Sequence, residues 1–316
     1  MTTTMTTTLN TTLNTSTRLR SPPVLRLIRT ARLDILTQLH LEEALFRHTS
    51  HDWLLVNDGV ATPAVVLGIS GKAAALVHEE RARAMGVPLI RRFTGGGTVV
   101  VDENSVMTSV IVGPGVCDDV KRFPKDVMRW THGLLFGGGD VDVDVEVDVE
   151  VDEKRRRAST VRRRAISLLE NDFTIGTRKV GGNAQAISGK RFLQHTSFLW
   201  DYREALMGLL KEPVKRPAYR GDRSHGGFVA SLREEVEKEV EEVEEVRRGG
   251  GGGGGGGGGT SGAREAFVDE MVSGCVVRGG WGGVVEVGVD EALGIVDDYR
   301  AQRATGRQVL LGSVYL

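Results

Sequence analysis

Arg91-Arg92-Phe93-Thr94-Gly95-Gly96-Gly97-Thr98-Val99-Val100-Val101-Asp102 is the stretch of sequence from which the rest of this chain is interpreted. A second glycine-rich stretch, Arg178-Lys179-Val180-Gly181-Gly182-Asn183-Ala184-Gln185, lies far downstream. Glycines let a ligand approach the main chain closely and leave N–H groups free to point at it. Arginine and lysine supply positive charge that a carboxylate or a phosphate shares. The two stretches together therefore predict a site for an anionic ligand.

Two common nucleotide-binding motifs do not account for these glycines. The triple glycine is not the spaced dinucleotide fingerprint, because no third glycine follows at the required interval. Gly68-Ile69-Ser70-Gly71-Lys72 ends in Gly-Lys but lacks the loop length and the Ser or Thr of a P-loop. Taken alone, a triple glycine is typical of a tight turn between strands.

A third stretch, His195-Thr196-Ser197-Phe198-Leu199, makes the combination specific. In order, the three resemble the lipoate–protein ligase family of the biotin/lipoate ligase superfamily, which carries Arg-Arg-x-Ser/Thr-Gly-Gly-Gly, then Lys-x-x-Gly-x-Ala, then a His before small and apolar residues. The resemblance runs over residues 25–228 and is interrupted by one insertion. Residues 178–185 and 195–202 are most similar to a eukaryotic branch of the family.

The chain departs from many relatives at two places. The family often has a His-Asp pair after the glycine run, whereas here Val101 takes the place of the His and only Asp102 remains. Bacterial members have Gly-Arg-x-Gln where this chain has residues 68–72, so cargo contacts from that loop cannot be carried over.

The resemblance implies an α+β fold: a mixed, largely antiparallel sheet flanked by helices. The residue patterns are compatible with it. Residues 34–47 have the spacing of an amphipathic helix with Asp34 as N-cap, and Glu42 and Glu43 stand among its apolar residues. Residues 57–59 have turn chemistry and predict a turn between two adjacent strands. The predicted strands are 24–29, 52–56, 64–69, 99–101, 106–112 and 192–202, and the predicted helices are 73–85, 124–136, 265–272 and 290–304.

The composition divides the chain into unequal parts. Residues 1–23 are rich in Thr, Ser and Arg, and no acidic residue precedes Asp34. This composition is typical of an organelle transit peptide, or of a disordered repeat that carries no targeting signal. We expect a mitochondrial or plastid location, or otherwise a cytoplasmic one. The remaining parts are a catalytic domain at 24–230 with a low-complexity insertion at 137–164, a charged helix and poly-glycine linker at 231–262, and a small C-terminal helical region at 263–316.

Charge and cysteine content exclude several classes of function. The formal net charge is −1, so no global field points to nucleic acid or to an acidic membrane surface. No apolar run approaches the ~20 residues needed to cross a bilayer. The two cysteines, Cys117 and Cys275, do not make a disulfide framework, and a reducing compartment fits.

The resemblance implies ATP-dependent attachment of lipoate, or octanoate, to a lysine of a lipoyl domain through lipoyl-AMP. ATP brings Mg²⁺, held mainly by phosphates and water. The implied acceptors are the lipoyl domains of 2-oxoacid dehydrogenase acyltransferase subunits and the glycine cleavage H protein. A carboxylate and an α-phosphate must meet although both are anions, and we predict that Lys179 lies between them as the catalytic residue.

The other site residues also follow from the resemblance. Arg92 and the main chain of the glycine run would hold phosphate or carboxylate, and no dedicated metal ligands are predicted. Asp102 is a candidate for a Mg²⁺ contact, and His195 is interpreted as packing the pocket wall. The predicted substrate and ATP contacts are Arg92, Thr94, Gly95, Gly96, Gly97, Thr98, Val99, Val100, Lys179, Gly182, Asn183 and Ala184.

Other functions remain as alternatives. One is a lipoyl or octanoyl transferase that uses preformed acyl-AMP. Family members that pass octanoate through a thioester use a cysteine shortly before the lysine, but no cysteine lies between Arg155 and Lys179, and Cys117 is far upstream. Biotin ligases carry a Gly-Arg-Gly-Arg loop that is absent here. A different class is a non-catalytic binder of adenylate or lipoyl domains. Residues 218–220 and 223–225 are interpreted as surface helix caps and salt bridges.

Overall fold

The computed structural model describes residues 22–137, 166–212, 216–238, 262–304 and 313–315. Most of the predicted transit segment, nearly all of the insertion at 137–164 and the poly-glycine linker lie outside the described residues. The predicted charged helix is described only at 231–238, of which 232–238 are helical. Among the described residues, no helix is both long and apolar enough to cross a membrane.

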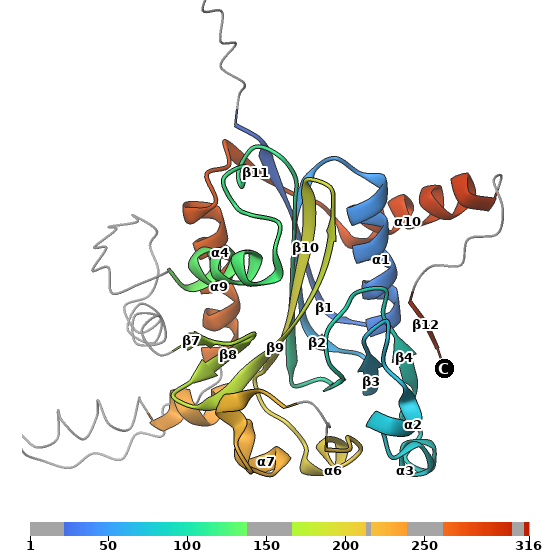
Figure 1. Cartoon of the computed structure of the whole chain (residues 1–316). Coiled ribbons are helices and arrows are strands. Elements are labelled where there is room, and N and C mark those ends of the chain that lie inside the picture. Colours follow the sequence, from blue (N-terminus) through green and yellow to red (C-terminus); the bar gives the residue numbers. More distant parts are fainter. Residues whose placement is uncertain (1–21, 138–165, 213–215, 239–261, 305–312, 316) are drawn as a thin grey trace, which may run out of the picture.

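An eight-stranded sheet forms the centre of the fold (Figure 1). β1 pairs in parallel with β11 and with β2, and every other neighbouring pair is antiparallel. The predicted mixed, largely antiparallel sheet is therefore confirmed. In spatial order the strands are β11 (Gly283–Glu286), β1 (Val24–Leu33), β2 (Asp52–Val60), β6 (Ser105–Val112), β10 (Arg191–Leu199), β9 (Arg178–Ser188), β8 (Asp172–Ile175) and β7 (Ile166–Leu169).

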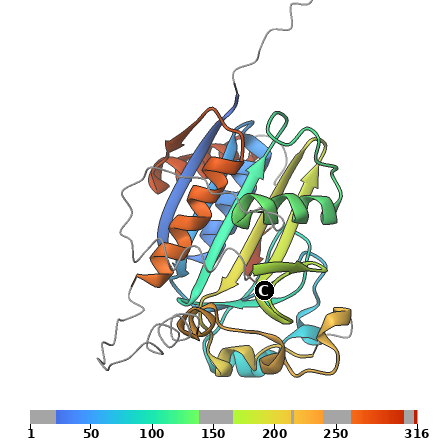
Figure 2. The same cartoon turned by 90° about the vertical axis from the view of Figure 1, so that its left-hand side faces the viewer.

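Helices cover both faces of this sheet (Figures 1 and 2). On one face lie α4 (Pro124–Phe136) and α9 (Ala263–Arg278) over an aromatic core. There the rings of Phe173 and Phe198 stack at 5.6 Å between centroids. On the other face lie α1 (Ile35–His48) and α10 (Val289–Ala304). The predicted cap of α1 is confirmed, because the Asp34 side chain accepts hydrogen bonds from the first-turn amides.

A smaller sheet packs beside the large one and contains β12 (Val314–Tyr315), β4 (Leu89–Arg91), β3 (Ala64–Leu67) and β5 (Val99–Val101), in that order. The turn predicted at residues 57–59 between two adjacent strands is wrong. These residues belong to β2, and β2 and β3 lie in different sheets. The Asn57 side chain exchanges two hydrogen bonds with the main chain of Leu33 and donates to Gln38. A buried amide with all these partners is stable inside a strand, despite its preference for turns.

Two further predictions need adjustment. The helix predicted at 73–85 is two short helices, α2 (Ala73–Leu76) and α3 (Glu79–Ala84), because Val77 leaves the helix to bridge Leu210. The C-terminal tail holds both predicted helices, but it also supplies β11 to the main sheet and Phe267 to the aromatic core. The domain boundaries stay a prediction, while the described part of the tail shares the core of the rest.

Candidate active site

The two glycine-rich stretches lie against each other. The turn after β4 carries the triple glycine, and β9 carries the second stretch. The Gly95 amide donates to the Gln185 carbonyl at 3.2 Å. A Cβ on Gly96 would lie 3.1 Å from the Asn183 oxygen and 3.3 Å from the Ala184 Cβ, so no side chain fits between turn and strand. The fold thus brings the predicted site residues of both stretches together.

Arg92 shapes this turn from inside. Its side chain is 2% exposed, and its guanidinium donates to the carbonyl oxygens of Gly95, Gly97 and Val66 at 2.7–3.3 Å. Burial lowers the pKa of Arg92 to about 10, against the opposing attraction of Glu42, so the group is still charged at neutral pH. The geometry gives Arg92 a role in holding the turn, and its direct contact with an anion stays a prediction.

The loop before α2 supports the turn from the other side. A Cβ on Gly68 would lie 2.2 Å from the Gly96 oxygen, so only glycine fits there. The Ile69 amide donates to the Thr94 carbonyl at 3.0 Å. Within the described residues, the buried hydroxyls of Thr94 and Thr98 have no hydrogen-bond partner. A phosphate or carboxylate bound at the glycine turn would accept hydrogen bonds from these two hydroxyls.

Lys179 lies at the start of β9, beside the end of the glycine run. Its Nζ is 3.4 Å from the position that a Cβ on Gly182 would take, and Val99 Cγ1 is equally close to that position. The side chain is 22% exposed, and Nζ forms an ion pair with Asp172 Oδ1 at 2.8 Å. Residues of both predicted stretches, Val99 from the first and Gly182 from the second, therefore lie close to the ammonium group of Lys179.

Asn183 and Ala184 divide between the two faces of β9. Asn183 Oδ1 accepts from Thr196 and Gln194 at 2.6 and 2.8 Å, so its side chain is committed to β10. Ala184 stands opposite His195 on the face that meets the triple glycine. Both residues were predicted to contact the substrate. Ala184 faces the glycine turn with its side chain, whereas Asn183 faces it only with its main-chain carbonyl.

His195 pairs with a buried glutamate. Its Nδ1 is 2.9 Å from Oε2 of Glu42, and Ser109 and Gln38 donate to the other carboxylate oxygen at 2.6 and 2.9 Å. Burial alone raises the pKa of Glu42, but attraction to His195 and these hydrogen bonds outweigh it and hold the pKa below its ordinary value. Sequence reasoning placed Glu42 in an amphipathic helix but gave it no part in the site. The sequence did hold a signal for it: Glu42 follows Leu39 by three residues, which places both on the same, apolar face of the helix.

The match to a family model decides the identity of this domain. The model of the lipoyl protein ligase A/B catalytic domain matches residues 34–248. The chain belongs to this family. The sequence resemblance is thereby confirmed for the family, and membership of its eukaryotic branch stays a prediction.

Curated relatives and solved structures agree with this family. The chain is 26% identical over 245 residues to a Plasmodium falciparum protein named inactive lipoate–protein ligase 2, covering 66% of this chain and 64% of that one. It is 26% identical over 184 residues to Staphylococcus aureus lipoate–protein ligase 2, covering 57% and 46%. The chain thus spans less than two thirds of the length of either relative.

Two solved structures share the fold. A lipoate–protein ligase A bound with ATP superposes with a TM-score of 0.55 at 17% identity, over 89% of this chain and 95% of that one. A Thermoplasma acidophilum structure with bound lipoic acid gives 0.54 at 16% identity, with the same coverage. At these identities the likeness shows the fold alone.

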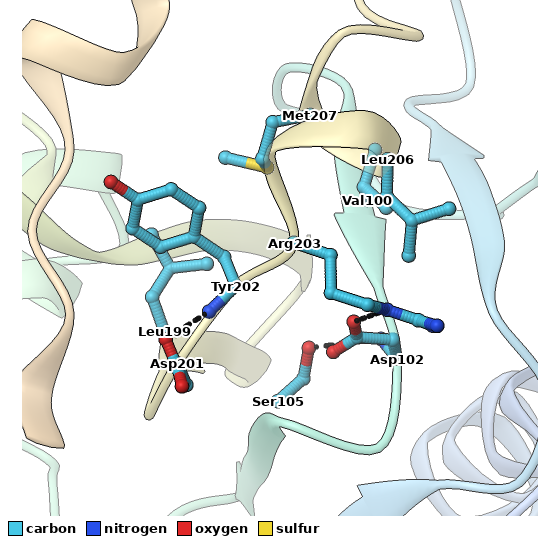
Figure 3. Close-up of a pocket in the computed structure, with 9 residues that line it drawn as sticks. All are labelled: Val100, Asp102, Ser105, Leu199, Asp201, Tyr202, Arg203, Leu206 and Met207. Carbon is cyan, nitrogen blue, oxygen red and sulfur yellow. Dashed lines mark hydrogen bonds and ion pairs between the residues drawn. The ribbon is translucent and has the colours of Figure 1, made fainter.

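In this member of the lipoate ligase family, Asp102 lies away from Lys179. It borders a small hollow lined by residues of β5, β6, the end of β10 and the segment after β10 (Figure 3). Val100 lines this hollow while its neighbour Val99 faces Gly182, so the hollow is on the other side of β5. Its volume of about 10 Å³ is the space of about one water molecule.

The carboxylate of Asp102 already has partners. Oδ2 accepts from Arg203 Nε at 3.2 Å, and Oδ1 accepts from the Asn104 amide at 2.9 Å. Among the described residues, no group of three or more His, Cys, Asp or Glu side chains is placed to hold a metal ion. The geometry gives Asp102 a turn-stabilising role, and its predicted contact with Mg²⁺ stays a prediction.

Cys117 lies at the opposite end of the strands from Lys179. Its thiol donates to the Gly113 carbonyl at 3.1 Å, just after the end of β6. The last residue of β6, Val112, pairs with Phe192 of β10, which in turn pairs with Ile187 near the end of β9. Lys179 lies at the start of β9. Burial raises the pKa of Cys117 to about 11, so the thiol is neutral at physiological pH. Cys117 therefore fits no thioester route through the Lys179 site.

The helix cap and salt bridge predicted at residues 218–220 and 223–225 are confirmed, since Ser224 Oγ accepts from the Gly227 amide and Arg220 pairs with Glu212, but Arg220 is buried and not at the surface. Residues 218–220 form the short helix η1 (Ala218–Arg220), which is followed by α7 (His225–Phe228). Arg220 is 2% exposed and pairs with Glu212 at 2.6 Å. The Tyr219 hydroxyl donates to Asp172. Asp172, the partner of Lys179, is the second site residue that sequence reasoning missed.

Proposed function

We propose that this chain catalyses ATP-dependent attachment of lipoate, or octanoate, to a lysine of a lipoyl domain through an acyl-AMP intermediate. The observation that carries the proposal is the convergence of Lys179 Nζ, the bare backbone of Gly182 and the end of the triple-glycine run at Val99. Membership of the lipoyl protein ligase family and relatives named lipoate–protein ligases support it.

In the first half-reaction, a carboxylate oxygen of lipoate attacks the α-phosphorus of ATP, and pyrophosphate leaves. Two anions approach each other in this step, and the Lys179 ammonium stabilises the charge that they bring together. The free hydroxyls of Thr94 and Thr98 would supply hydrogen bonds to the same groups. Arg92 keeps the turn in shape through its three carbonyl contacts.

In the second half-reaction, a neutral lysine amine of the acceptor attacks the acyl carbonyl, an amide forms and AMP leaves. The acyl phosphate already provides the leaving group, so no protein nucleophile is needed. This fits the distant position of Cys117. Mg²⁺ would accompany ATP, held mainly by phosphate oxygens and water.

The acceptors that we propose are lipoyl domains of 2-oxoacid dehydrogenase acyltransferase subunits and the glycine cleavage H protein. A similar solved structure comes from a structural analysis of a Thermoplasma acidophilum lipoate protein ligase and its E2 lipoyl domain. This supports lipoyl domains of acyltransferase subunits as acceptors. A mitochondrial or plastid location is also a proposal, and it rests on the Thr- and Arg-rich composition of residues 1–23. A reporter fused to residues 1–32 that stays in the cytosol would refute it.

A second candidate function follows from one relative. The Plasmodium falciparum protein is named an inactive lipoate–protein ligase, which supports the alternative that this chain does not make acyl-AMP itself and is a transferase or a binder. Lipoate-dependent ATP–pyrophosphate exchange by the purified protein tests the ligase directly. Transfer from synthetic lipoyl-AMP to a lipoyl domain without exchange would indicate a transferase. Calorimetric binding of lipoyl-AMP with neither activity would indicate a binder.

A further inference from the structure

Lys179 is anchored by an element that is far from it in sequence. One oxygen of the Asp172 carboxylate, Oδ1, is 2.8 Å from Lys179 Nζ. The other oxygen, Oδ2, accepts a hydrogen bond of 2.8 Å from the Tyr219 hydroxyl. With each oxygen bound to a different partner, the carboxylate cannot rotate without losing a contact. The ammonium group of Lys179 therefore has a fixed partner and not merely a nearby negative charge.

Tyr219 is itself held in place. The main-chain amides of Ala218 and Tyr219 both donate to Glu170 Oε1, at 2.7 and 3.3 Å, and so dock η1 on the turn between β7 and β8. The Tyr219 ring packs on Phe228 at 5.3 Å between centroids. Burial and the neighbouring Asp172 raise the pKa of Tyr219, so its hydroxyl keeps the proton that it donates.

The same segment also binds the main chain of Lys179. The Ala230 amide donates to the Lys179 carbonyl at 2.8 Å, and Val229 forms a parallel bridge with Lys179. Residues 216–230 therefore contact the lysine through its backbone and through its ion-pair partner. β9 alone fixes the Cα of Lys179 but leaves its four-carbon side chain free, which costs rotamer entropy whenever Nζ must be held at one point.

We propose that Tyr219 and Asp172 are positioning residues for Lys179. The Tyr219 hydroxyl orients the Asp172 carboxylate, and the carboxylate holds Nζ over Gly182, where the two substrate anions would meet. The catalytic part of this statement rests on the proposed function. The positional part does not, because it concerns where the ammonium group lies in the free protein.

Trace acetylation tests the positional part without any turnover. The purified chain is labelled under native conditions, and modification of Lys179 is measured by mass spectrometry relative to Lys190, an exposed lysine of the same molecule. In the wild type, Lys179 should label more slowly than Lys190. Tyr219→Phe keeps the ring contact with Phe228 and removes only the hydroxyl. It should raise the Lys179/Lys190 ratio about 2- to 10-fold, the effect of one hydrogen bond.

Two variants complete the series. Asp172→Asn should raise the ratio at least as much as Tyr219→Phe, since it removes the charge that holds Nζ. Tyr315→Phe changes a tyrosine that is 56% exposed on β12 and should leave the ratio unchanged. A Tyr219→Phe protein with an unaltered labelling ratio would overturn the proposal, even if its stability were lower, because only a packing role would then remain.

Kinetics test the catalytic part. Tyr219→Phe should lower kcat of pyrophosphate exchange about 2- to 10-fold, with the KM values for lipoate and ATP changed less, because the contact matters most when the two anions approach. A changed labelling ratio with normal kcat would overturn the catalytic role. If the wild type shows no exchange, the proposed function fails, while the labelling series still decides the placement of Lys179.

Discussion

The amide of Gly95 donates a hydrogen bond to the carbonyl oxygen of Gln185, at 3.2 Å. This contact joins a turn between two strands of the small sheet to a strand of the large sheet. Next to it, Gly96 fits against Ala184 with no room for a side chain. The site proposed here is built at this junction, so its geometry depends on how the two sheets pack.

Lys179→Ala should reduce lipoate-dependent pyrophosphate exchange by roughly 100- to 1,000-fold, the usual effect of removing a preorganised charge donor. Lys179→Arg should be nearly as poor, because a planar guanidinium cannot take the point position of an ammonium between two anions. The control is Lys190→Ala, which changes an exposed lysine and should be mild. Near-normal exchange by Lys179→Ala would refute the assigned role.

Gly68→Ala should destabilise the chain, because the new methyl would lie 2.2 Å from the Gly96 oxygen. Overpacking of this kind costs about 1–3 kcal/mol of unfolding free energy. Gly97→Ala is the matched control in the partner loop, since a Cβ there meets nothing within 4 Å. Urea denaturation of both variants measures the difference, and equal stability would show that the two loops separate easily.

Glu42 should make stability depend on pH in the acid range. Its folded pKa lies below the ordinary value of 4.5, so its contribution is complete above that value and is lost as the pH falls through the lower folded pKa. Glu42→Gln should therefore flatten the acid limb of the stability curve at pH values below the ordinary pKa of 4.5. Urea denaturation at a series of pH values provides the test. Parallel curves for wild type and variant would contradict the Glu42–His195 pairing.

Both cysteines should resist thiol reagents while the protein is folded. Burial raises the pKa of Cys117 to about 11 and that of Cys275 to about 12, so almost no thiolate exists at pH 8. We expect iodoacetamide to label them only after denaturation, and Cys117→Ala to retain transfer activity. Loss of transfer in a stably folded Cys117→Ala protein would revive a thioester route.

The local pattern was sufficient for most individual elements. The Asp34 cap, the helix at 124–136 and both tail helices followed from short-range chemistry and are present. The turn predicted at 57–59 failed because the deciding contacts come from Leu33 and Gln38. A turn preference is a local property, whereas burial of an amide depends on residues that are distant in the chain.

The candidate site divides in the same way. The motifs marked Arg92, the glycines and Lys179, because those residue types carry charge or bare backbone that an anion needs. They did not mark Glu42, Asp172 or Tyr219, whose partners stand on other elements. The sequence shows an Asp or a Glu in the same way whether its carboxylate faces water or forms an ion pair with a lysine.

The sequence by itself determined the family and, through it, the mixed sheet, and it supplied the candidate residues for holding an anion, because motif spacing and residue chemistry can be read along the chain. Tertiary structure alone decided which of these residues meet. It turned the Arg92 guanidinium inward onto three carbonyls, separated Asp102 from Lys179 across β5, and gave Lys179 its contact with Asp172. The physical reason is that hydrogen bonds and ion pairs act over about 3 Å, a separation that only folding creates between residues far apart in the chain.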